Sequence, residues 1–375
     1  MKIETACLHA VRDHTTNTGA VALPIYQSAT FAHPGVGKST GYDYSRSQNP
    51  TREHCEKMVA ALEGGCGGLG FSSGMAAIAC LMDLFSPGDE IVATADLYGG
   101  TIRLFNHISA KNGLVIKYAD TSDLTTLEGV LTEKTRAVFI ETPTNPMMGL
   151  TDIAAVKRLL KSPDTLLIAD NTFLTPILSR PIALGADIVV HSGTKYLAGH
   201  NDTLAGFLVA AAPEQEDKLR FLQKTSGAVL SPFDSFLVVR GIKTLALRMA
   251  HSCKSAAVIA AWLQTQPWVT RVYYPGMGAM LSFTVTSEET AKQLLEGVEI
   301  IQYAESLGGV ESLLTYPFTQ THADVPVAER IARGIDERLL RLSVGIEDAQ
   351  DLIADLACAA DSDTACRKEN LYVQL

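Results

Sequence analysis

The chain alternates short apolar segments with amphipathic helical patterns over much of its length. The apolar segments are residues 90–95, 114–119, 137–141, 166–170, 187–191 and 207–212, and helical patterns between them include residues 101–113, 123–131 and 151–161. Short, almost uniformly apolar segments are typical of strands that are buried on both faces of a parallel sheet. Helices between such strands provide the crossover connections that the sheet needs. The pattern therefore predicts an α/β fold with a mostly parallel sheet flanked by helices.

Both ends of this alternating region differ from it. Residues 1–50 are rich in Thr, Gly, Pro and Tyr and show no sustained period, so we expect an extended arm. A helical pattern begins near Thr51, a candidate N-cap, and stops at Gly64. After about residue 233, a helical stretch over about residues 235–264 leads into mixed strands and helices, which indicates a smaller α+β domain.

These changes define the expected domain organisation. An N-terminal arm (residues 1–50) that contacts a neighbouring subunit precedes a large domain (residues 51–234) and a small C-terminal domain (residues 235–361). Residues 362–375 form a tail, and its ending, ENLYVQL, is similar to a protease-cleavage tag. We therefore expect the tail to lie outside the fold.

Composition excludes several classes of protein. The 375 residues carry 41 acidic and 31 basic side chains, a net charge of −10, which disfavours general binders of nucleic acid or anionic membranes. No run of the sequence approaches the roughly 20 apolar residues of a membrane span. The seven cysteines are scattered and form no C-x-x-C pair, so we expect no zinc site or other metal and no disulfide framework. Together with the polar N-terminus, this favours the cytoplasm.

Two glycine-rich motifs indicate other classes of protein, but their context argues against both. Residues 65–70 (GCGGLG) fit the dinucleotide-binding pattern, which requires a preceding strand, whereas a helical pattern precedes them here. Residues 70–74 (GFSSG) fit the nucleophile elbow of α/β-hydrolases, with Ser72 as nucleophile and Asp170 and His191 as partners. No HGGG-like oxyanion loop precedes the motif, and His191 lies within a strand pattern. The hydrolase remains as the alternative from another class.

A lysine and an aspartate follow two of the predicted strands. Lys195 lies in the sequence HSGTKY, directly after a strand pattern and between small and hydroxyl residues. Partial burial there would favour the neutral amine, which can form a Schiff base with an aldehyde cofactor. Asp170 ends the segment LLIAD, where it could pair with a protonated pyridine nitrogen or cap a following helix.

An anion site is also predicted. Ser72, Ser73, Gly74 and Met75 precede an apolar helical pattern, so their amides and the Ser73 hydroxyl would lie at a helix N-terminus, which suits phosphate. Further hydroxyls come from Ser192 and Thr194. An ordinary serine cap explains the helix start equally well.

Eight segments spread along the chain carry a more specific signal. They are YSRSQNPTR (residues 44–52), SSGM (72–75), DLYGGT (96–101), ETPTNP (141–146), ADNTF (169–173), HSGTKYLAGHND (191–202), AESLGGVESL (304–313) and RLSVGIEDAQDLIADL (341–356). In this order and combination they resemble the Cys/Met-metabolism family of pyridoxal-5′-phosphate (PLP) enzymes. The resemblance covers nearly the whole chain. It implies the PLP-dependent transferase fold of type I, with a sheet of the seven-stranded type and a smaller α+β C-terminal domain.

The resemblance also implies contacts to the cofactor. Lys195 would hold PLP and move the Cα proton of the substrate, Asp170 would pair with the pyridine nitrogen, and Tyr98 would stack on the ring and assist proton transfer. The cofactor phosphate would be bound by Ser73, Gly74, Met75, Ser192 and Thr194, and by Tyr44 and Arg46 of a neighbouring subunit. Catalytic dimers of this family pair into tetramers, so the resemblance implies a homotetramer.

The substrate implied by the resemblance is a small amino acid. Arg341 would bind its α-carboxylate, and Asn145 would orient cofactor and substrate. Other substrate contacts would come from Asp43, Arg103, Glu305 and Ser306, although Asp43 and Glu305 also fit ordinary surface acids. The implied reaction makes or cleaves cystathionine by γ-replacement or γ-elimination. The alternative is a cystathionine β-lyase or another cysteine-type C–S lyase.

One segment departs from the family pattern. A longer stretch normally separates a Tyr-Pro-Gly like residues 274–276 from the strand that starts near Met280. Here only Met277, Gly278 and Ala279 join them. The short connection puts the local fold of the C-terminal domain in question and leaves the cofactor residues unaffected.

Overall fold

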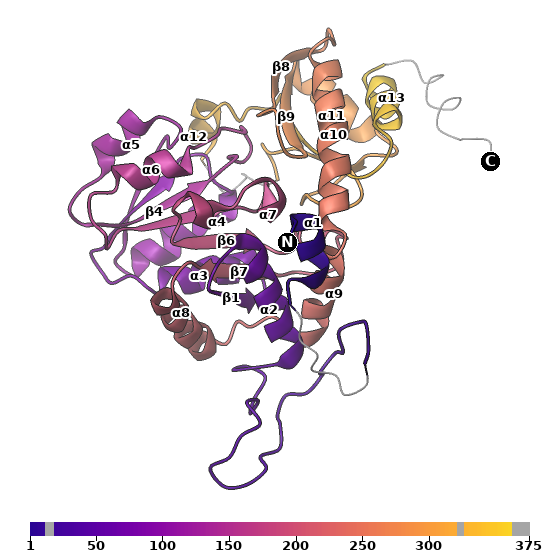
Figure 1. The fold of residues 1–375 in the computed structure, drawn as a ribbon. Coiled ribbons are helices and arrows are strands. Elements are labelled where there is room, and N and C mark those ends of the chain that lie inside the picture. Colours follow the sequence, from indigo (N-terminus) through magenta and orange to yellow (C-terminus); the bar gives the residue numbers. More distant parts are fainter. Residues whose placement is uncertain (12–18, 321–325, 362–375) are drawn as a thin grey trace. The chain divides into compact units, whose positions relative to one another are not determined.

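The computed structural model describes residues 1–11, 19–320 and 326–361, and Figure 1 shows its fold. The chain forms two compact units. Unit 1 comprises Met1–Thr94, Leu104–Ile140 and Asp152–Ala246, and unit 2 comprises Ala95–Arg103, Glu141–Thr151 and Leu247–Leu375. Two short segments from the first half of the chain thus belong to unit 2. The domain boundaries expected from the sequence stay a prediction.

A seven-stranded sheet forms the centre of unit 1. Its strands are β1 (Gly67–Phe71), β2 (Glu90–Thr94), β3 (Val115–Ala119), β4 (Thr135–Glu141), β5 (Leu166–Asp170), β6 (Ile188–Ser192) and β7 (Gly206–Ala210), in the order β1-β7-β6-β5-β4-β2-β3. Strand β2 is parallel to β3 and β4, and β5 is parallel to β6. Strand β7 is antiparallel to both β1 and β6. The predicted α/β fold with a mostly parallel sheet is confirmed.

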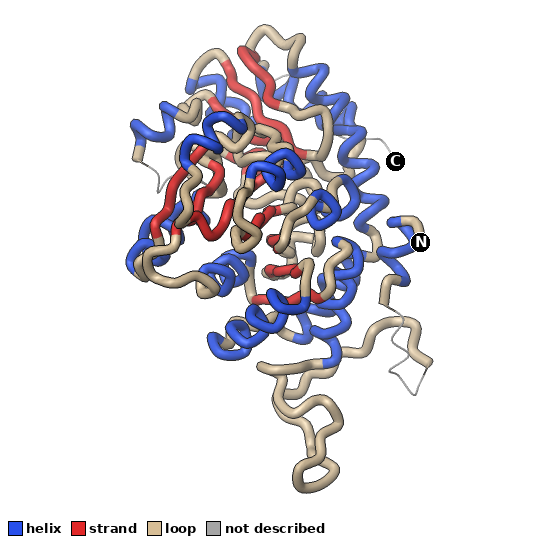
Figure 2. The backbone as a smooth tube through the Cα atoms, turned by 60° about the vertical axis from the view of Figure 1, so that its left-hand side comes forward, coloured by secondary structure: helices blue, strands red, loops and turns tan. Residues whose placement is uncertain are grey.

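Unit 1 also contains helices. They are α1 (Ile3–His9), α2 (Pro50–Glu63), α3 (Gly74–Met82), α5 (Leu124–Val130), α6 (Ile153–Leu159), α7 (Thr175–Leu178), α8 (Pro213–Ser226) and α9 (Pro232–Ile242), with a π-helix at Leu104–Ser109 and a 3₁₀ helix at Pro181–Leu184. Helices α2 and α8 contact β1, and α3 contacts β6 and β7. Residues 19–49 lack helices and strands, and both Figure 1 and Figure 2 show this arm running away from the sheet.

Helix α2 does not begin at the predicted cap. Asn49 is the N-cap, and its side-chain oxygen accepts a hydrogen bond from the Thr51 N–H at 3.0 Å. Pro50 occupies the first helical position, where its missing N–H is not needed. The Thr51 hydroxyl instead donates to the Pro24 carbonyl at 3.0 Å, which ties the arm to the helix. The predicted cap is therefore wrong, whereas the stop at Gly64, with φ +80°, is confirmed.

The single helix expected over about residues 235–264 is in fact two, α9 and α10 (Leu245–Leu263). Gly241 in α9 lies so close to Ala198 that an added Cβ would be 2.0 Å from the Ala198 carbonyl oxygen. The Thr244 hydroxyl, between the helices, donates to the Gly241 carbonyl at 3.1 Å. A hydroxyl that bonds the backbone in this way competes with helix continuation. The apolar period of the sequence carries no sign of either contact.

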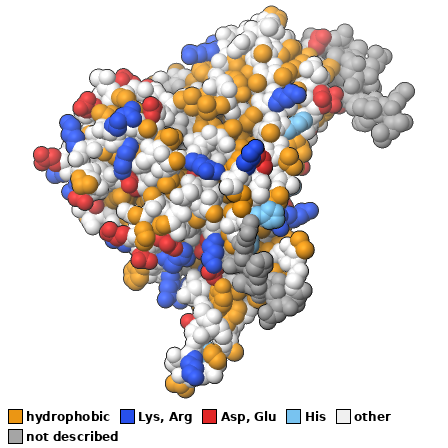
Figure 3. All heavy atoms as spheres, in the orientation of Figure 1, with side chains coloured by type: hydrophobic (Ala, Val, Ile, Leu, Met, Phe, Trp, Pro, Cys, Tyr) orange, Lys and Arg blue, Asp and Glu red, His pale blue; other side chains and the backbone are white. Residues whose placement is uncertain are grey.

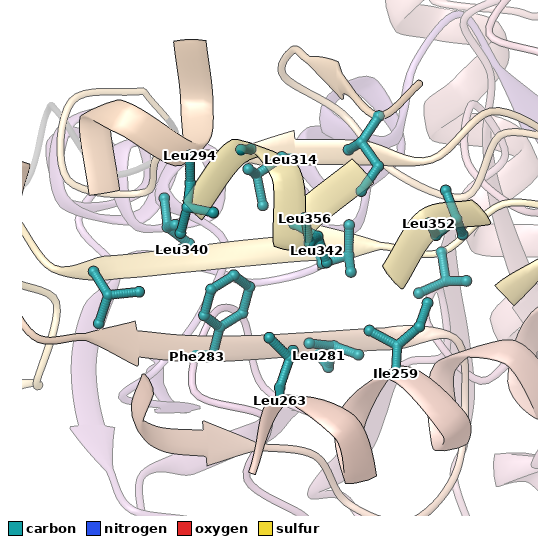
Figure 4. Packing of buried hydrophobic residues seen from close by; sticks show 14 of the residues in the cluster. Ile259, Leu263, Leu281, Phe283, Leu294, Leu314, Leu340, Leu342, Leu352 and Leu356 are labelled. Carbon is teal, nitrogen blue, oxygen red and sulfur yellow. The ribbon is translucent and has the colours of Figure 1, made fainter. Parts of the chain in front are cut away.

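A five-stranded sheet forms the centre of unit 2. Its strands are β8 (Val269–Tyr273), β9 (Met280–Val285), β10 (Gln302–Tyr303), β11 (Leu313–Thr315) and β12 (Leu339–Ser343), in the order β10-β11-β12-β9-β8. Unit 2 also contains helices α4 (Gly99–Arg103), α11 (Glu288–Gly297), α12 (Val327–Ala332) and α13 (Ala349–Ala360). Side chains of α10, α11 and α13 pack on β9 and β12, as Figure 4 shows for Leu263, Leu294 and Leu356. The C-terminal region is α+β, as predicted.

The short connection in this region closes a hairpin. Strands β8 and β9 are antiparallel, with Tyr273 opposite Ser282. Between them Gly276 and Gly278 have φ values of +79° and +78°, which glycine adopts without steric cost. The Tyr274 hydroxyl donates to the Gly278 carbonyl at 3.3 Å. The shortened segment is thus a compact turn that leaves both strands paired.

Membrane-spanning helices are absent from the part of the chain that the structure describes. The same ranges contain no group of three or more His, Cys, Asp or Glu side chains that could hold a metal ion. Cys7, Cys55, Cys66, Cys80 and Cys253 are free thiols. Cys358 is disulfide-bonded, which the cysteine spacing did not predict.

Candidate functional site

Polar groups gather where β1 leads into α3. Ser73 is the N-cap of α3, and its hydroxyl oxygen accepts a hydrogen bond from the Ala76 N–H at 3.1 Å. Gly74 follows so close to the end of β6 that an added Cβ would lie 3.1 Å from Ser192 Cα and 3.2 Å from Ser192 Oγ. The Ser192 hydroxyl therefore adjoins the first turn of α3, which also contains Met75. Helix amides beside a hydroxyl are suited to bind an anion.

The turn after β6 carries Lys195. Its N–H donates to the Ser192 carbonyl at 3.1 Å, and its carbonyl accepts from the Gly199 N–H at 2.8 Å. The Thr194 hydroxyl donates to the Ala205 carbonyl at 3.2 Å and accepts from the Ala205 N–H at 2.9 Å. Lys195 is partly buried. Strand β6 thus places Lys195, Ser192 and Thr194 in one short turn.

Asp170 ends β5, the neighbour of β6. Its carboxylate accepts a hydrogen bond from the Thr172 N–H at 2.9 Å, and the Thr172 hydroxyl accepts one from the Ser192 N–H at 2.9 Å. Loss of hydration raises the pKa of Asp170 above its usual range, although Thr172 and the imidazole of His191 oppose this shift. A carboxylate in this environment is stabilised by a cationic partner.

The structure argues against both alternative motifs. His191 is fully buried in β6, and its Nε2 lies 2.6 Å from Glu63 Oε1, so its ring is engaged where a hydrolase would need it to activate Ser72. The glycines of residues 65–70 mostly belong to β1, not to a loop between a strand and a helix. A Cβ at Gly68 would lie 2.5 Å from the Glu56 carbonyl of α2, which is a packing reason for this glycine.

The arm groups three predicted residues at the surface of unit 1. The Arg46 guanidinium lies 5.6 Å from the centre of the Tyr44 ring and donates to the Lys224 carbonyl at 2.5 Å. Asp43 accepts a hydrogen bond from the Ser39 hydroxyl at 2.6 Å. Asp43, Tyr44 and Arg46 are all exposed, and Figure 3 shows apolar side chains along the arm. Arg46 therefore contacts Lys224 of the same chain, whereas the other residues predicted for the phosphate lie at the start of α3, at the end of β6 and in the turn that follows β6.

Arg341 of β12 is the most deeply buried candidate in unit 2, with 1% of its surface exposed. Its Nη1 donates to Asn145 Oδ1 at 2.8 Å, and its Nη2 donates to the Ser306 carbonyl at 3.0 Å and to Thr315 Oγ1 at 3.2 Å. These neutral acceptors fix the guanidinium plane without cancelling its charge, which suits an anionic ligand. The sequence did not indicate Thr315, because only the β11–β12 register places it opposite Arg341.

Tyr98 and Arg103 belong to one short segment of unit 2. The Tyr98 N–H donates to Glu141 Oε2 at 3.0 Å, and 41% of the tyrosine remains exposed. Glu141, which the sequence did not indicate as a site residue, thus fixes the Tyr98 backbone while the ring stays accessible for stacking. Arg103 ends α4 and is exposed, as is Glu305, which lies between β10 and β11.

Comparison with known proteins decides the family. Residues 4–361 match the model of the "Cys/Met metabolism PLP-dependent enzyme" family. The chain belongs to this family. The cystathionine gamma-synthase of Haemophilus influenzae is 50% identical over 356 residues, which cover 94% of this chain and 96% of that protein.

Two further proteins agree with this assignment. The Bacillus subtilis protein named cystathionine gamma-synthase/O-acetylhomoserine (thiol)-lyase is 52% identical over 339 residues, covering 90% of this chain and 91% of that protein. The crystal structure of cystathionine gamma-lyase from Lactobacillus plantarum complexed with L-serine is 41% identical and has a TM-score of 0.93, covering 96% of this chain and 98% of that chain. The predicted family, type I fold and PLP cofactor are confirmed.

The protein is therefore a PLP-dependent enzyme, and the residues of unit 1 fit this cofactor. Lost hydration raises the pKa of Asp170, so a cationic pyridine nitrogen would stabilise its carboxylate. The first turn of α3 and the Ser192 hydroxyl meet in the close contact that a phosphate site requires. Lys195 follows Ser192 in the same turn.

A substitution at Gly206 tests whether the close packing at the start of α3 is needed for stability and PLP binding. A Cβ there would lie 2.0 Å from the Ser73 carbonyl oxygen and 2.7 Å from Gly74 N. We expect Gly206→Ala to displace the start of α3, to lower the free energy of unfolding by about 1–3 kcal/mol and to weaken PLP binding about tenfold or more. Thermal unfolding of the apoprotein and titration with PLP measure the two effects.

Gly129→Ala is the matched control. A Cβ at Gly129 in α5 has no neighbour within 4 Å in the described structure, so alanine should keep or slightly raise the stability. An unchanged PLP affinity in Gly206→Ala would contradict the proposed phosphate site.

Proposed function

We propose that this enzyme makes or cleaves cystathionine by γ-replacement or γ-elimination. The observation that carries the proposal is the 50% identity, over 94% of this chain, to a protein named cystathionine gamma-synthase. The buried Arg341 supports an amino-acid substrate, because its guanidinium can bind an α-carboxylate through two parallel hydrogen bonds. β-Elimination, as in a cystathionine β-lyase or another cysteine-type C–S lyase, is the second candidate. It needs the same residues to bind the α-carboxylate and to remove the Cα proton.

In this proposal the following residues hold the cofactor. Lys195 binds PLP covalently, and Asp170 pairs with its pyridine nitrogen. Tyr98 stacks on the ring. The phosphate is bound by Ser73, Gly74, Met75, Ser192 and Thr194. When bound, PLP supplies an electron sink for negative charge that develops at the substrate Cα.

The chain's own groups then bind the substrate and move its protons. Arg341 binds the α-carboxylate, and Asn145 keeps the guanidinium plane in place. The neutral Lys195 amine removes the Cα proton, and Tyr98 assists the transfers that follow. A second proton removal, at Cβ, permits loss or exchange of the Cγ substituent, whereas direct loss of a Cβ substituent gives β-elimination.

The distal part of the substrate requires further contacts. Ser306 lies beside Arg341 through its carbonyl and has a φ of +94°, which constrains the loop that follows Glu305. Exposed Asp43, Glu305 and Arg103 are proposed to bind the distal amino and carboxylate groups.

We also propose a homotetramer built from catalytic dimers, in the cytoplasm. The arm supports the assembly, because Val21 and Val36 are fully exposed and Tyr44 is 47% exposed, a pattern that favours burial against another copy. In the assembly, Tyr44 and Arg46 bind the PLP phosphate of the neighbouring subunit. Arg46 suits this role because a guanidinium binds phosphate through two parallel hydrogen bonds.

A hybrid enzyme tests the donation of Arg46 between subunits. Arg46→Ala and Lys195→Ala should each be nearly inactive alone, but their mixed dimer contains one site with both native residues. Random assembly of equal amounts should restore about one quarter of wild-type activity. The measurement is activity after co-expression and purification of the hybrid. Lys38→Ala, an exposed arm variant, should be active without any partner, and lack of restoration in the hybrid would disprove the donation.

Product analysis tests the proposed reaction. With cystathionine alone, 2-oxobutyrate indicates γ-elimination and pyruvate indicates β-elimination. Formation of cystathionine from cysteine and an activated homoserine indicates the synthase reaction. If none of these products forms with PLP-loaded enzyme, the proposed function is wrong.

A further inference from the structure

A buried acid and a buried imidazole meet behind the strand ends that carry Asp170 and Lys195. Glu63 is the last residue of α2, and His191 lies in β6. His191 Nε2 and Glu63 Oε1 are 2.6 Å apart, and both side chains are fully buried. His191 Nδ1 and Glu63 Oε2 are buried without a hydrogen-bond partner in the structure. The proposed reaction uses neither residue.

The Glu63 carboxylate joins the two strand ends. Besides His191 of β6, Glu63 Oε1 accepts a hydrogen bond from Asn171 Nδ2 at 2.7 Å, and Asn171 directly follows Asp170. The Asn171 N–H also donates to the Val190 carbonyl of β6 at 3.0 Å. One carboxylate oxygen thus holds the residue after Asp170 and a residue four positions before Lys195.

The pair is also close enough to act on Asp170 electrostatically. The His191 imidazole lowers the pKa of Asp170, against the loss of hydration that raises it. A buried pair of an acid and an imidazole contributes little to stability compared with apolar side chains of the same size. Its presence beside Asp170 therefore calls for a role other than stability.

We propose that Glu63 and His191 are positioning residues that fix the end of β5 and hold the Asp170 carboxylate toward the PLP pyridine nitrogen. The pair acts through Asp170 and contacts neither substrate nor the reacting atoms. The inference rests on the proposed contact between Asp170 and the cofactor. It adds that this contact depends on the hydrogen bonds that Glu63 of α2 makes to His191 of β6 and to Asn171.

The test is the ¹⁵N NMR signal of the pyridine nitrogen in enzyme loaded with ¹⁵N-labelled PLP. His191→Gln keeps a donor toward Glu63 but removes the imidazole, and Glu63→Gln keeps the shape but replaces the carboxylate with an amide. Both should move the signal from the protonated toward the unprotonated position. Both should also weaken PLP binding about tenfold. His191→Phe, which loses the donor as well, should weaken PLP binding further than His191→Gln.

Two controls separate this inference from general damage and from failure of the proposed function. Glu56→Gln removes another buried acid of α2, which accepts from the Gly70 N–H at 2.9 Å, and should leave the ¹⁵N signal unchanged even if the melting temperature falls. Asp170→Asn should move the ¹⁵N signal all the way to the unprotonated position.

Three outcomes would contradict the inference. If Asp170→Asn moves the signal but His191→Gln and Glu63→Gln do not, the positioning role is wrong. If Asp170→Asn does not move it, the proposed cofactor contact fails and the inference fails with it. A shift in Glu56→Gln as large as in Glu63→Gln also overturns the positioning role.

Discussion

Replacing Lys195 by alanine should lower kcat by about 10²–10⁴-fold, the usual contribution of a general base. Lys195 is the proposed base at Cα and the proposed covalent anchor of PLP, so both functions disappear together. Its position supports this role, because β6 and the Ser192–Gly199 turn fix its backbone through hydrogen bonds of 3.1 Å and 2.8 Å. Steady-state rates with cystathionine give the kcat, and the visible absorbance of the purified protein reports the covalent cofactor.

Borohydride provides the direct readout of the anchor. Reduction of the wild-type enzyme should fix PLP to the peptide that contains Lys195, whereas denatured Lys195→Ala should release all of its cofactor. Lys157→Ala is a suitable control, because Lys157 pairs with Asp187 at 2.7 Å and is 37% exposed at its side chain. A label on another lysine, or a kcat for Lys195→Ala within tenfold of wild type, would refute the assignment.

The order of most strands and helices of unit 1 was predictable because strands such as β2, β6 and β7 are buried on both faces. Strand β1 was not predicted, because its sequence, GGLGF, is mostly glycine. Strands such as β5 and β6 are almost entirely apolar, and an apolar run bounded by polar residues is visible in a sequence without knowledge of its neighbours. The break between α9 and α10 was not predictable in this way. At the break the Thr244 hydroxyl donates to the Gly241 carbonyl, and Gly241 lies close to the Ala198 carbonyl; neither contact leaves a periodic signal in the sequence. The prediction of Thr51 as the N-cap of α2 was wrong for a similar reason, since the Thr51 hydroxyl donates to the Pro24 carbonyl of the arm.

The residues of the candidate site also differ in whether the sequence could indicate them. Lys195 and Asp170 were indicated because each follows an apolar strand, where parallel topology places functional residues. The apolar neighbours of Arg341 likewise agree with its burial. Glu63 gave no signal, because it ends an ordinary amphipathic helix and meets its partners His191 and Asn171 only through the fold. The acids Asp43 and Glu305 are exposed, so their proposed roles depend on substrate binding rather than on internal contacts.

Replacing Arg341 by methionine should lower kcat/KM by about 10²–10³-fold, because losing one partner of a buried charged contact costs about 2–5 kcal/mol. Most of the loss should appear in KM, since the α-carboxylate is present in substrate and transition state alike. Arg341→Lys should recover little, because a lysine keeps the charge but cannot donate to Asn145 and Thr315 in one plane. The measurement is kcat and KM with cystathionine, alongside the melting temperature of each variant.

The α-carboxylate itself provides the sharpest comparison for Arg341. An amine analogue of the substrate that lacks this group should react slowly, and at the same rate with wild type and Arg341→Met, because neither can use the missing contact. Loss of folding would instead slow both substrates. Arg338→Met is the matched control: Arg338 pairs with Asp336 at 2.5 Å and is 47% exposed at its side chain, so both substrates should keep their wild-type rates. If Arg341→Met slows the amine analogue as strongly as cystathionine, Arg341 supports the fold of unit 2 and does not bind the carboxylate.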